Sequence, residues 1–246
     1  MSTSSVPVYT HAHEVVYHQD RYDKRRRLLR DYLLRPIGLG LLVRAEVHGA
    51  EYIPPGGPLL IMMNHIAGID PFVVVAVVRT RNIVPMSKIE NYENPITGLM
   101  ARTWGAFPVR RGEIDRQALE STLALLDQGR AVLIAPEGTR KPALSEAKDG
   151  ITYVAIKSGA TILPVGLDGT DGFPGSLKRL RRTQVTVRFG RPFRLEAPPR
   201  GRVPRDALHQ MTREAMWQLA RLLPEHRRGF YRDLDRMTTE HITFVD

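Results

Sequence analysis

The segment over residues 64–71 reads Asn-His-Ile-Ala-Gly-Ile-Asp-Pro and places His65 five residues before Asp70. The preceding residues 59–63 are wholly apolar, which is typical of a buried strand. Asp70 followed by Pro71 predicts the start of a helix, with Asp70 as its N-cap. A histidine in the intervening turn can fold back against the carboxylate, and such a paired imidazole can take a proton from a hydroxyl group. Because such pairs also occur by chance, the interpretation depends on the rest of the chain.

Three further segments with reactive or glycine-rich character follow, each at the end of a short apolar run or within one. They are residues 105–112 (Gly-Ala-Phe-Pro-Val-Arg-Arg-Gly), 135–140 (Ala-Pro-Glu-Gly-Thr-Arg) and 162–166 (Ile-Leu-Pro-Val-Gly). Helical patterns separate them. In an open α/β sheet the loops at the carboxyl ends of the strands meet in one crevice. We therefore expect the four segments to line a single pocket.

The alternation of strand and helix patterns predicts an α/β fold, a single domain with a largely parallel central sheet flanked by helices. Strands are expected near residues 44–48, 59–63, 82–86, 105–109, 131–135, 161–167 and 184–189. Helices are expected near residues 71–80, 88–103, 115–128, 148–158 and 204–223. This arrangement would bring the four segments to one edge of the sheet.

In order and spacing, the four segments resemble the glycerolipid acyltransferase family, which includes 1-acylglycerol-3-phosphate O-acyltransferase. The family signature consists of an Asn-His-x4-Asp block, a Gly-x5-Arg block, a Pro-Glu-Gly-Thr block and a final Pro-Val block. The likeness extends over most of the chain and includes Lys148 shortly after the third block. It implies an enzyme that transfers a fatty acyl group from a thioester of coenzyme A, or of acyl carrier protein, to the free hydroxyl of a lysophospholipid. The favoured acceptor is 1-acylglycerol-3-phosphate, which would give phosphatidic acid, and the alternative within the same family is another lyso-lipid acceptor.

The resemblance also implies roles for individual residues. His65 would be the general base, and Asp70 would orient it and offset its transient positive charge. Arg111 matches the phosphate-binding arginine of the family, and a guanidinium fork suits a phosphate monoester. Arg110 adds a second positive charge, and alternation along a strand would point the two side chains in opposite directions. No acyl-enzyme is required, and the absence of cysteine excludes a thiol nucleophile.

The third segment supplies further candidates for substrate binding. Gly138 permits a tight turn whose N–H groups can face phosphate oxygens, and Thr139 adds a hydroxyl donor. The carboxylate of Glu137 would repel a phosphate, so we interpret it as holding a neighbouring Arg or Thr, or as contacting the glycerol. Arg140 and Lys148 are candidates for the same anion site. The structural alternative is a strand-to-loop turn in which Pro and Gly serve only the backbone.

Composition favours an anionic partner. The chain has 246 residues, 42% of them hydrophobic, and a net charge of +10 that comes largely from arginine. We expect a mobile tail over residues 1–20, a basic amphipathic helical segment over 21–43, the acyltransferase domain over 44–223 and a tail over 224–246. The start of the chain lacks the apolar stretch of a signal peptide, and no apolar run approaches the length of a membrane span.

The basic segment allows two interpretations. Leucine and tyrosine residues four apart within residues 28–33 would give a helix an apolar stripe flanked by arginine, and Pro36 should kink or end that helix. The stripe either lies in the interface of an anionic membrane or packs on the enzyme core. In the first case the protein would be peripheral on the cytoplasmic, inner face of the membrane. The basic cluster over residues 178–182 is a second candidate contact for lipid or coenzyme A phosphates.

Two other classes of function compete with this interpretation. A non-catalytic lipid-binding protein on the same fold would need neither His65 nor Asp70, so their presence argues against it. Nucleic-acid binding would rest on the positive charge alone, since the chain lacks a basic stripe with stacking aromatic residues, and no nucleic-acid partner is expected. No metal site and no resident cofactor are expected, because the acyl thioester is a co-substrate.

Overall fold

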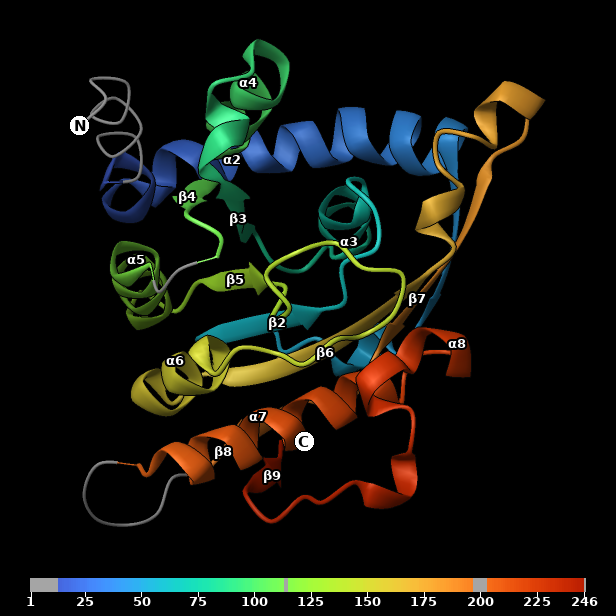
Figure 1. The fold of residues 1–246 in the computed structure, drawn as a ribbon. Coiled ribbons are helices and arrows are strands. Elements are labelled where there is room, and N and C mark those ends of the chain that lie inside the picture. Colours follow the sequence, from blue (N-terminus) through green and yellow to red (C-terminus); the bar gives the residue numbers. More distant parts are fainter. Residues whose placement is uncertain (1–12, 113–114, 197–202, 246) are drawn as a thin grey trace.

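The computed structural model describes residues 13–112, 115–196 and 203–245, which form one mixed, mostly parallel sheet flanked by helices (Figure 1). Seven strands follow the order β1-β7-β6-β2-β5-β3-β4, β8 pairs with β6, and β9 pairs with β8. The strands are β1 (Val43–His48), β2 (Leu59–Met63), β3 (Ile83–Lys88), β4 (Phe107–Val109), β5 (Ala131–Ile134), β6 (Thr161–Asp168), β7 (Thr183–Phe189), β8 (Phe193–Leu195) and β9 (Ile242–Phe244).

Helices cover both faces of this sheet (Figure 1). A π-helical stretch over Arg30–Leu42 continues the first labelled helix without a break, and short 3-10 turns connect several other elements. The α-helices are α2 (Gln19–Leu29), α3 (Asp70–Val77), α4 (Pro95–Trp104), α5 (Arg116–Asp127), α6 (Gly150–Ser158), α7 (Arg205–Ala220) and α8 (Glu225–Arg228).

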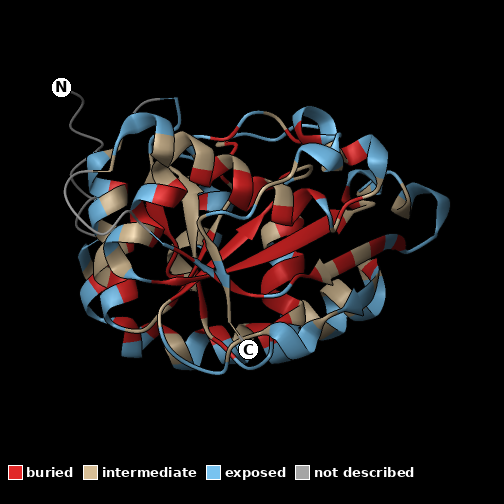
Figure 2. Cartoon of the chain, turned by 90° about the horizontal axis from the view of Figure 1, so that it is seen from below, coloured by how far each residue is buried: buried red, intermediate tan, exposed pale blue. Residues whose placement is uncertain are grey.

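Strand β2 lies in the middle of the sheet, parallel to β5 on one side and to β6 on the other. All five of its side chains are buried, because helices cover both faces. Leu60 and Met62 face the core under α5, α6 and α7, whereas Leu59, Ile61 and Met63 face the core under α3. Figure 2 shows the buried residues concentrated in these central strands and on the helix faces that turn toward them. This packing fixes the carboxyl end of β2.

The expected fold class is confirmed, and the expected strands and helices lie close to the observed ones. Three elements were not expected: β8, β9 and α8. Residues 224–246 were expected to form a tail, but α8 and β9 lie within this segment, and β9 pairs with β8. Of the N-terminal segment expected to be mobile, residues 1–12 lie outside the described part. Residues 13–17 are helical, with Val15 and Val16 buried in the core.

The basic segment over residues 21–43 is helical as far as Leu42. Pro36 therefore does not end the helix, contrary to one of the two outcomes expected for it. One row of its apolar side chains, Leu34, Leu39 and Leu42, packs on the core next to α3. The stripe expected from the sequence faces outward instead, since Leu28 and Leu33 are about half exposed and Tyr32 is 77% exposed.

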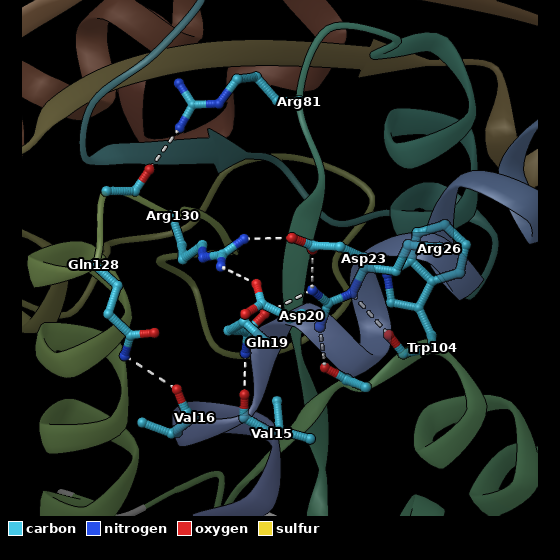
Figure 3. A network of polar contacts seen from close by, with 12 residues as sticks. Val15, Val16, Gln19, Asp20, Asp23, Arg26, Arg81, Trp104, Gln128 and Arg130 are labelled. Carbon is cyan, nitrogen blue, oxygen red and sulfur yellow. Dashed lines mark hydrogen bonds and ion pairs between the residues drawn. The ribbon is translucent and has the colours of Figure 1, made fainter.

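A buried arginine joins this helix to the rest of the domain (Figure 3). Arg26 is 1% exposed and donates to the carbonyl oxygens of Trp104 and Gly105 at 2.9 Å each. It also donates to Gln19 at 2.7 Å, and burial lowers its pKa to about 10. A guanidinium that is satisfied in this way holds α2 against the C-terminal end of α4.

None of the helices in the described ranges combines the length and the apolar content that crossing a bilayer would require.

Candidate active site

His65 and Asp70 face one another across the turn between β2 and α3. The Nδ1 atom of His65 lies 2.8 Å from Oδ2 of Asp70, and the two residues are 6% and 0% exposed. When Nδ1 carries the proton and donates it to the carboxylate, the other ring nitrogen, Nε2, is the basic one. The turn therefore presents an oriented imidazole with one nitrogen held and one left for chemistry.

The carboxylate of Asp70 is also the acceptor that shapes this turn. Its Oδ2 atom accepts from the backbone N–H groups of Ile66 and Ala67, at 2.6 and 2.8 Å. The expectation that Asp70 is the N-cap of the helix is wrong: it is the first residue of α3, Ile69 precedes it as the cap, and no side chain caps this helix. The carboxylate turns back toward His65, so it stabilises the turn before the helix instead of the helix N-terminus.

Asn64 holds the end of β2 in place. Its side-chain amide donates to the carbonyl oxygen of Leu167 at 2.9 Å and accepts from the N–H of Leu167 at 2.8 Å. The residue is 3% exposed, so both bonds are protected from water. Through this pair of bonds β6 fixes the position of the residue directly before the histidine.

The third sequence segment packs against the histidine from the other side. Glu137 is 7% exposed and accepts from the N–H of Ser145 at 2.8 Å and from its hydroxyl at 3.0 Å. Burial raises the pKa of Glu137, and the bonds from Ser145 and from the N–H of His65 oppose that rise. The N–H of Lys141 in turn donates to the carbonyl oxygen of His65 at 2.9 Å. Glu137 thus binds Ser145 and the backbone at His65, and not the Arg or Thr side chain that the sequence suggested.

Two arginines bring positive charge to this region. The Nη1 atom of Arg140 lies 3.4 Å from the point that a Cβ atom on Gly68 would occupy, so its guanidinium sits beside the turn between His65 and Asp70. Arg111 is exposed and lies two residues after the end of β4. Partial burial of its guanidinium and the positive charge of Arg140 lower the pKa of Arg111, and Glu90 partly offsets this. Arg140 and Arg111 therefore lie within electrostatic range of each other.

The remaining candidates lie on the same loop or next to it. Gly138 has a left-handed backbone, with φ of +69°, as a tight turn requires. The aliphatic chain of Lys148 passes beside it, and the N–H of Lys148 donates to the carbonyl oxygen of Pro136 at 3.2 Å. Thr139 is exposed at the surface. The N–H of Arg110 donates to the carboxylate of Asp115 at 2.7 Å, which anchors its backbone at the start of α5.

The C-terminal segment holds this loop in a way that no sequence motif indicated. Arg227 of α8 donates to Asp168 and Asp171 at 2.7 Å each and to the carbonyl oxygen of Pro142 at 2.9 Å. The N–H of Leu144 donates to the carbonyl oxygen of Arg227 at 2.8 Å. Arg227 is one of many arginines in a basic chain, so only the folded structure distinguishes it from the others.

One group of possible metal ligands lies away from this turn, on α7 and just before β9. In the described part of the chain, oxygen and nitrogen atoms of Glu214, Glu240 and His241 lie within 4.8 Å of one another. The buried carboxylate of Glu214 already accepts from the N–H of His241 at 2.9 Å and from the hydroxyl of Thr238 at 3.0 Å. These bonds join α7 to the segment just before the last strand, so the three residues have a structural role without a metal ion.

Comparison with known proteins agrees with the motifs. The family model described as Acyltransferase matches residues 44–168. This chain belongs to the acyltransferase family. A 1-acyl-sn-glycerol-3-phosphate acyltransferase of Borreliella burgdorferi is 30% identical over 53% of this chain and 54% of its own length. The human protein named 1-acyl-sn-glycerol-3-phosphate acyltransferase alpha is 28% identical over 76% of this chain and 67% of its own length.

The match with the first of these relatives spans about half of that protein's length. Among solved structures, the 1-acyl-sn-glycerophosphate acyltransferase PlsC of Thermotoga maritima aligns over 96% of this chain and 98% of its own, with a TM-score of 0.57 and 20% identity. At that identity the likeness is one of fold. The matched family region includes the His65 turn, both arginines and the loop that carries Glu137.

Proposed function

We propose that this protein is an O-acyltransferase that moves a fatty acyl group from a thioester, acyl-CoA or acyl carrier protein, to the free hydroxyl of 1-acylglycerol-3-phosphate. The observation that carries the proposal is the buried 2.8 Å contact between His65 and Asp70. It is supported by the arginines beside the turn and by the names of the related acyltransferases.

In the proposed reaction, Nε2 of His65 takes the proton of the acceptor hydroxyl as its oxygen attacks the thioester carbonyl carbon. The carbon–sulfur bond breaks when the tetrahedral intermediate collapses, and the imidazolium returns its proton to the departing thiolate. Asp70 stabilises the imidazolium between these two steps. A positioned base contributes about 10²–10⁴ in rate, or roughly 3–5 kcal/mol. The thioester is consumed as a substrate, and the scheme requires no resident cofactor.

Arg111 and Arg140 would bind the phosphate of the acceptor in this scheme. Two guanidinium groups in electrostatic range repel one another, so a dianionic phosphate between them relieves that repulsion. Lys148, Thr139 and the turn at Gly138 would complete the anion site. Glu137 would act indirectly, by holding the loop against the backbone of His65.

The acceptor and the product are membrane lipids, so we also propose that the helical segment over residues 21–43 rests on the inner face of an anionic membrane. Its outward stripe supports this: Tyr32 is 77% exposed and Leu41 is 66% exposed. Arg25 and Arg27 are exposed on the same helix. A basic residue near an anionic surface contributes about 1 kcal/mol.

An acceptor panel tests the proposed activity. Purified protein is given one acyl-CoA together with 1-acylglycerol-3-phosphate, glycerol 3-phosphate or a lyso-lipid without a phosphate monoester, and His65→Ala is the matched inactive control. We expect the fastest transfer to 1-acylglycerol-3-phosphate. A preference for the lyso-lipid without a phosphate monoester would overturn the acceptor assignment. Equal turnover by His65→Ala would overturn the assignment of the base.

A further inference from the structure

We propose that two elements outside the basic helix, α4 and the turn over residues 176–182, are contacts for an anionic phospholipid surface and form one docking surface with that helix. The inference rests on the proposed function, because it identifies the side of the molecule at which the lipid acceptor would be met. It adds α4, which the sequence did not indicate, and it assigns to lipid the basic cluster over residues 178–182, for which lipid and coenzyme A phosphates were both candidates.

The first contact is the outer face of α4. Ile96, Leu99 and Met100 are 70%, 67% and 44% exposed. Their spacing of three and four residues places them together on one side of the helix. Asn94 caps α4 by accepting from the N–H groups of Ile96 and Thr97, at 3.0 and 3.1 Å, so the helix is well formed and presents these side chains in a fixed geometry. Adjacent exposed apolar side chains of this size mark an interaction site.

The second contact is the tip of the turn between β6 and β7. Leu180 is 97% exposed, and its φ of +53° lies in the left-handed region that a leucine rarely occupies. A leucine in this conformation that is almost fully exposed to water contributes no buried apolar area to the stability of the domain. Lys178, Arg179 and Arg181 flank it in the sequence and carry the charge that attracts anionic headgroups. An exposed apolar side chain with basic residues on both sides in the sequence fits a membrane interface.

The long helix connects these two contacts. At its N-terminal end, Arg26 bonds the carbonyl oxygens of Trp104 and Gly105 at the end of α4 (Figure 3). At its C-terminal end, Arg182 of the turn donates to the carbonyl oxygens of Leu39 and Val43, at 2.5 and 2.9 Å. In Figure 1, α4, the helix and the turn all lie along the upper side of the molecule. Side-chain bonds at both ends therefore hold the three elements on one side as a unit.

A lipid surface fits this arrangement better than a protein partner does. The exposed apolar residues are spread over three separate elements instead of being gathered in one groove, which suits a broad surface. The helical segment over residues 21–42 carries seven basic residues, of which Arg26 and Arg30 are buried, and two acidic ones. The turn carries four basic residues and no acidic one. Charge complementarity therefore points to anionic headgroups.

Vesicle co-sedimentation tests the proposal with uncharged substitutions. Leu180→Asn removes the apolar tip, leaves the charge unchanged and introduces a residue that tolerates a left-handed backbone. Leu99→Gln removes an exposed apolar side chain from α4 and leaves the charge unchanged, and glutamine is a good helix former. Phe230→Gln is the matched control, since Phe230 is 56% exposed but lies directly after α8, which Figure 1 draws well below α4 and the basic helix.

With phosphatidylglycerol vesicles we expect Leu180→Asn and Leu99→Gln each to weaken binding about tenfold, which matches the loss of one buried leucine. Phe230→Gln should bind like the wild type, and phosphatidylcholine vesicles should bind all variants weakly. Unchanged binding by the double variant, or an equal loss in Phe230→Gln, would overturn the proposal. Equal wild-type binding to phosphatidylcholine would overturn the electrostatic part of it. If the substitutions weaken binding to an acidic acyl carrier protein but not to vesicles, the surface binds a protein and the lipid proposal is overturned.

The same variants separate this inference from the proposed reaction. Turnover of a short-chain acceptor that stays monomeric in water should be unchanged in Leu180→Asn and Leu99→Gln, whereas His65→Ala should lose turnover and keep vesicle binding. A wild-type protein that binds vesicles but transfers no acyl group would overturn the reaction and leave the docking surface standing. A wild-type protein that transfers the acyl group but does not bind vesicles would overturn the docking surface alone.

Discussion

Asp70→Asn separates the electrostatic role of Asp70 from its structural role. In this variant the amide oxygen can take the place of Oδ2 and still accept from His65, Ile66 and Ala67. The NH2 group then lies where Oδ1 lies, an atom without a hydrogen-bond partner in the described part of the chain. The geometry of the turn is kept and the negative charge is lost.

The size of the effect follows from that lost charge. Two unit charges about 4 Å apart attract by about 4 kcal/mol at an effective dielectric constant of about 20. The amide dipole keeps part of this attraction for the imidazolium, so kcat should fall roughly 10²–10³-fold. Asp70→Ala also removes the acceptor for two backbone N–H groups, and we expect it to lower the free energy of unfolding by about 3 kcal/mol or more.

The assay is direct because the chain contains no cysteine, so a thiol-reactive dye reports only the coenzyme A that is released. Thermal unfolding of both variants shows whether the turn survives. The reasoning would be refuted if Asp70→Asn retained its fold and turned over within about threefold of the wild type. Equal losses of stability in Asp70→Asn and Asp70→Ala would refute the claim that the amide preserves the turn, and a fall in kcat could then not be assigned to the lost charge.

Three further outcomes test the surrounding residues. Arg111→Ala should raise the KM for a phosphate-bearing acceptor about 10- to 100-fold, because a charge-assisted bond is lost. Arg110→Ala should change this KM less than about threefold. Equal effects would contradict the assignment of the phosphate contact to Arg111. Asn64→Ala leaves a buried N–H and a buried carbonyl oxygen unpaired, so denaturant unfolding should show a loss of about 2–4 kcal/mol. Arg227→Gln should lower the Tm at pH 7, and this difference from the wild type should shrink toward pH 3. Arg227 holds the pKa of Asp171 below its usual 3.8, so the stability contributed by this pair is lost as the pH falls through the lowered pKa. A difference in Tm that stays constant with pH would contradict this role of Arg227.

The sequence alone was sufficient for the fold class and for the central contact. Wholly apolar runs such as residues 59–63 identify buried parallel strands, because helices cover both of their faces. A turn of six residues between such a strand and a helix restricts where a side chain can reach. The spacing therefore allowed His65 and Asp70 to meet, and the family resemblance made that pairing the expected one. The sequence was less informative about which backbone groups share the carboxylate, and the N-cap assignment was wrong for that reason.

Contacts between distant parts of the chain had no such signal. The bonds of Arg227 to Asp168 and Asp171 span more than fifty residues, and nothing in a charge-rich segment distinguishes this arginine from its neighbours. Strand β9 is three residues long and pairs only with the short β8, so its alternation is too brief to recognise. Long-range pairing of polar side chains is decided by the folded geometry.

The most direct test of the account is the turnover of His65→Ala with 1-acylglycerol-3-phosphate and an acyl-CoA, measured on protein whose unfolding transition matches that of the wild type. Loss of the proposed base should reduce kcat by at least about 10²-fold. Near-normal transfer by the folded variant would contradict the account, because another group would then have to remove the proton.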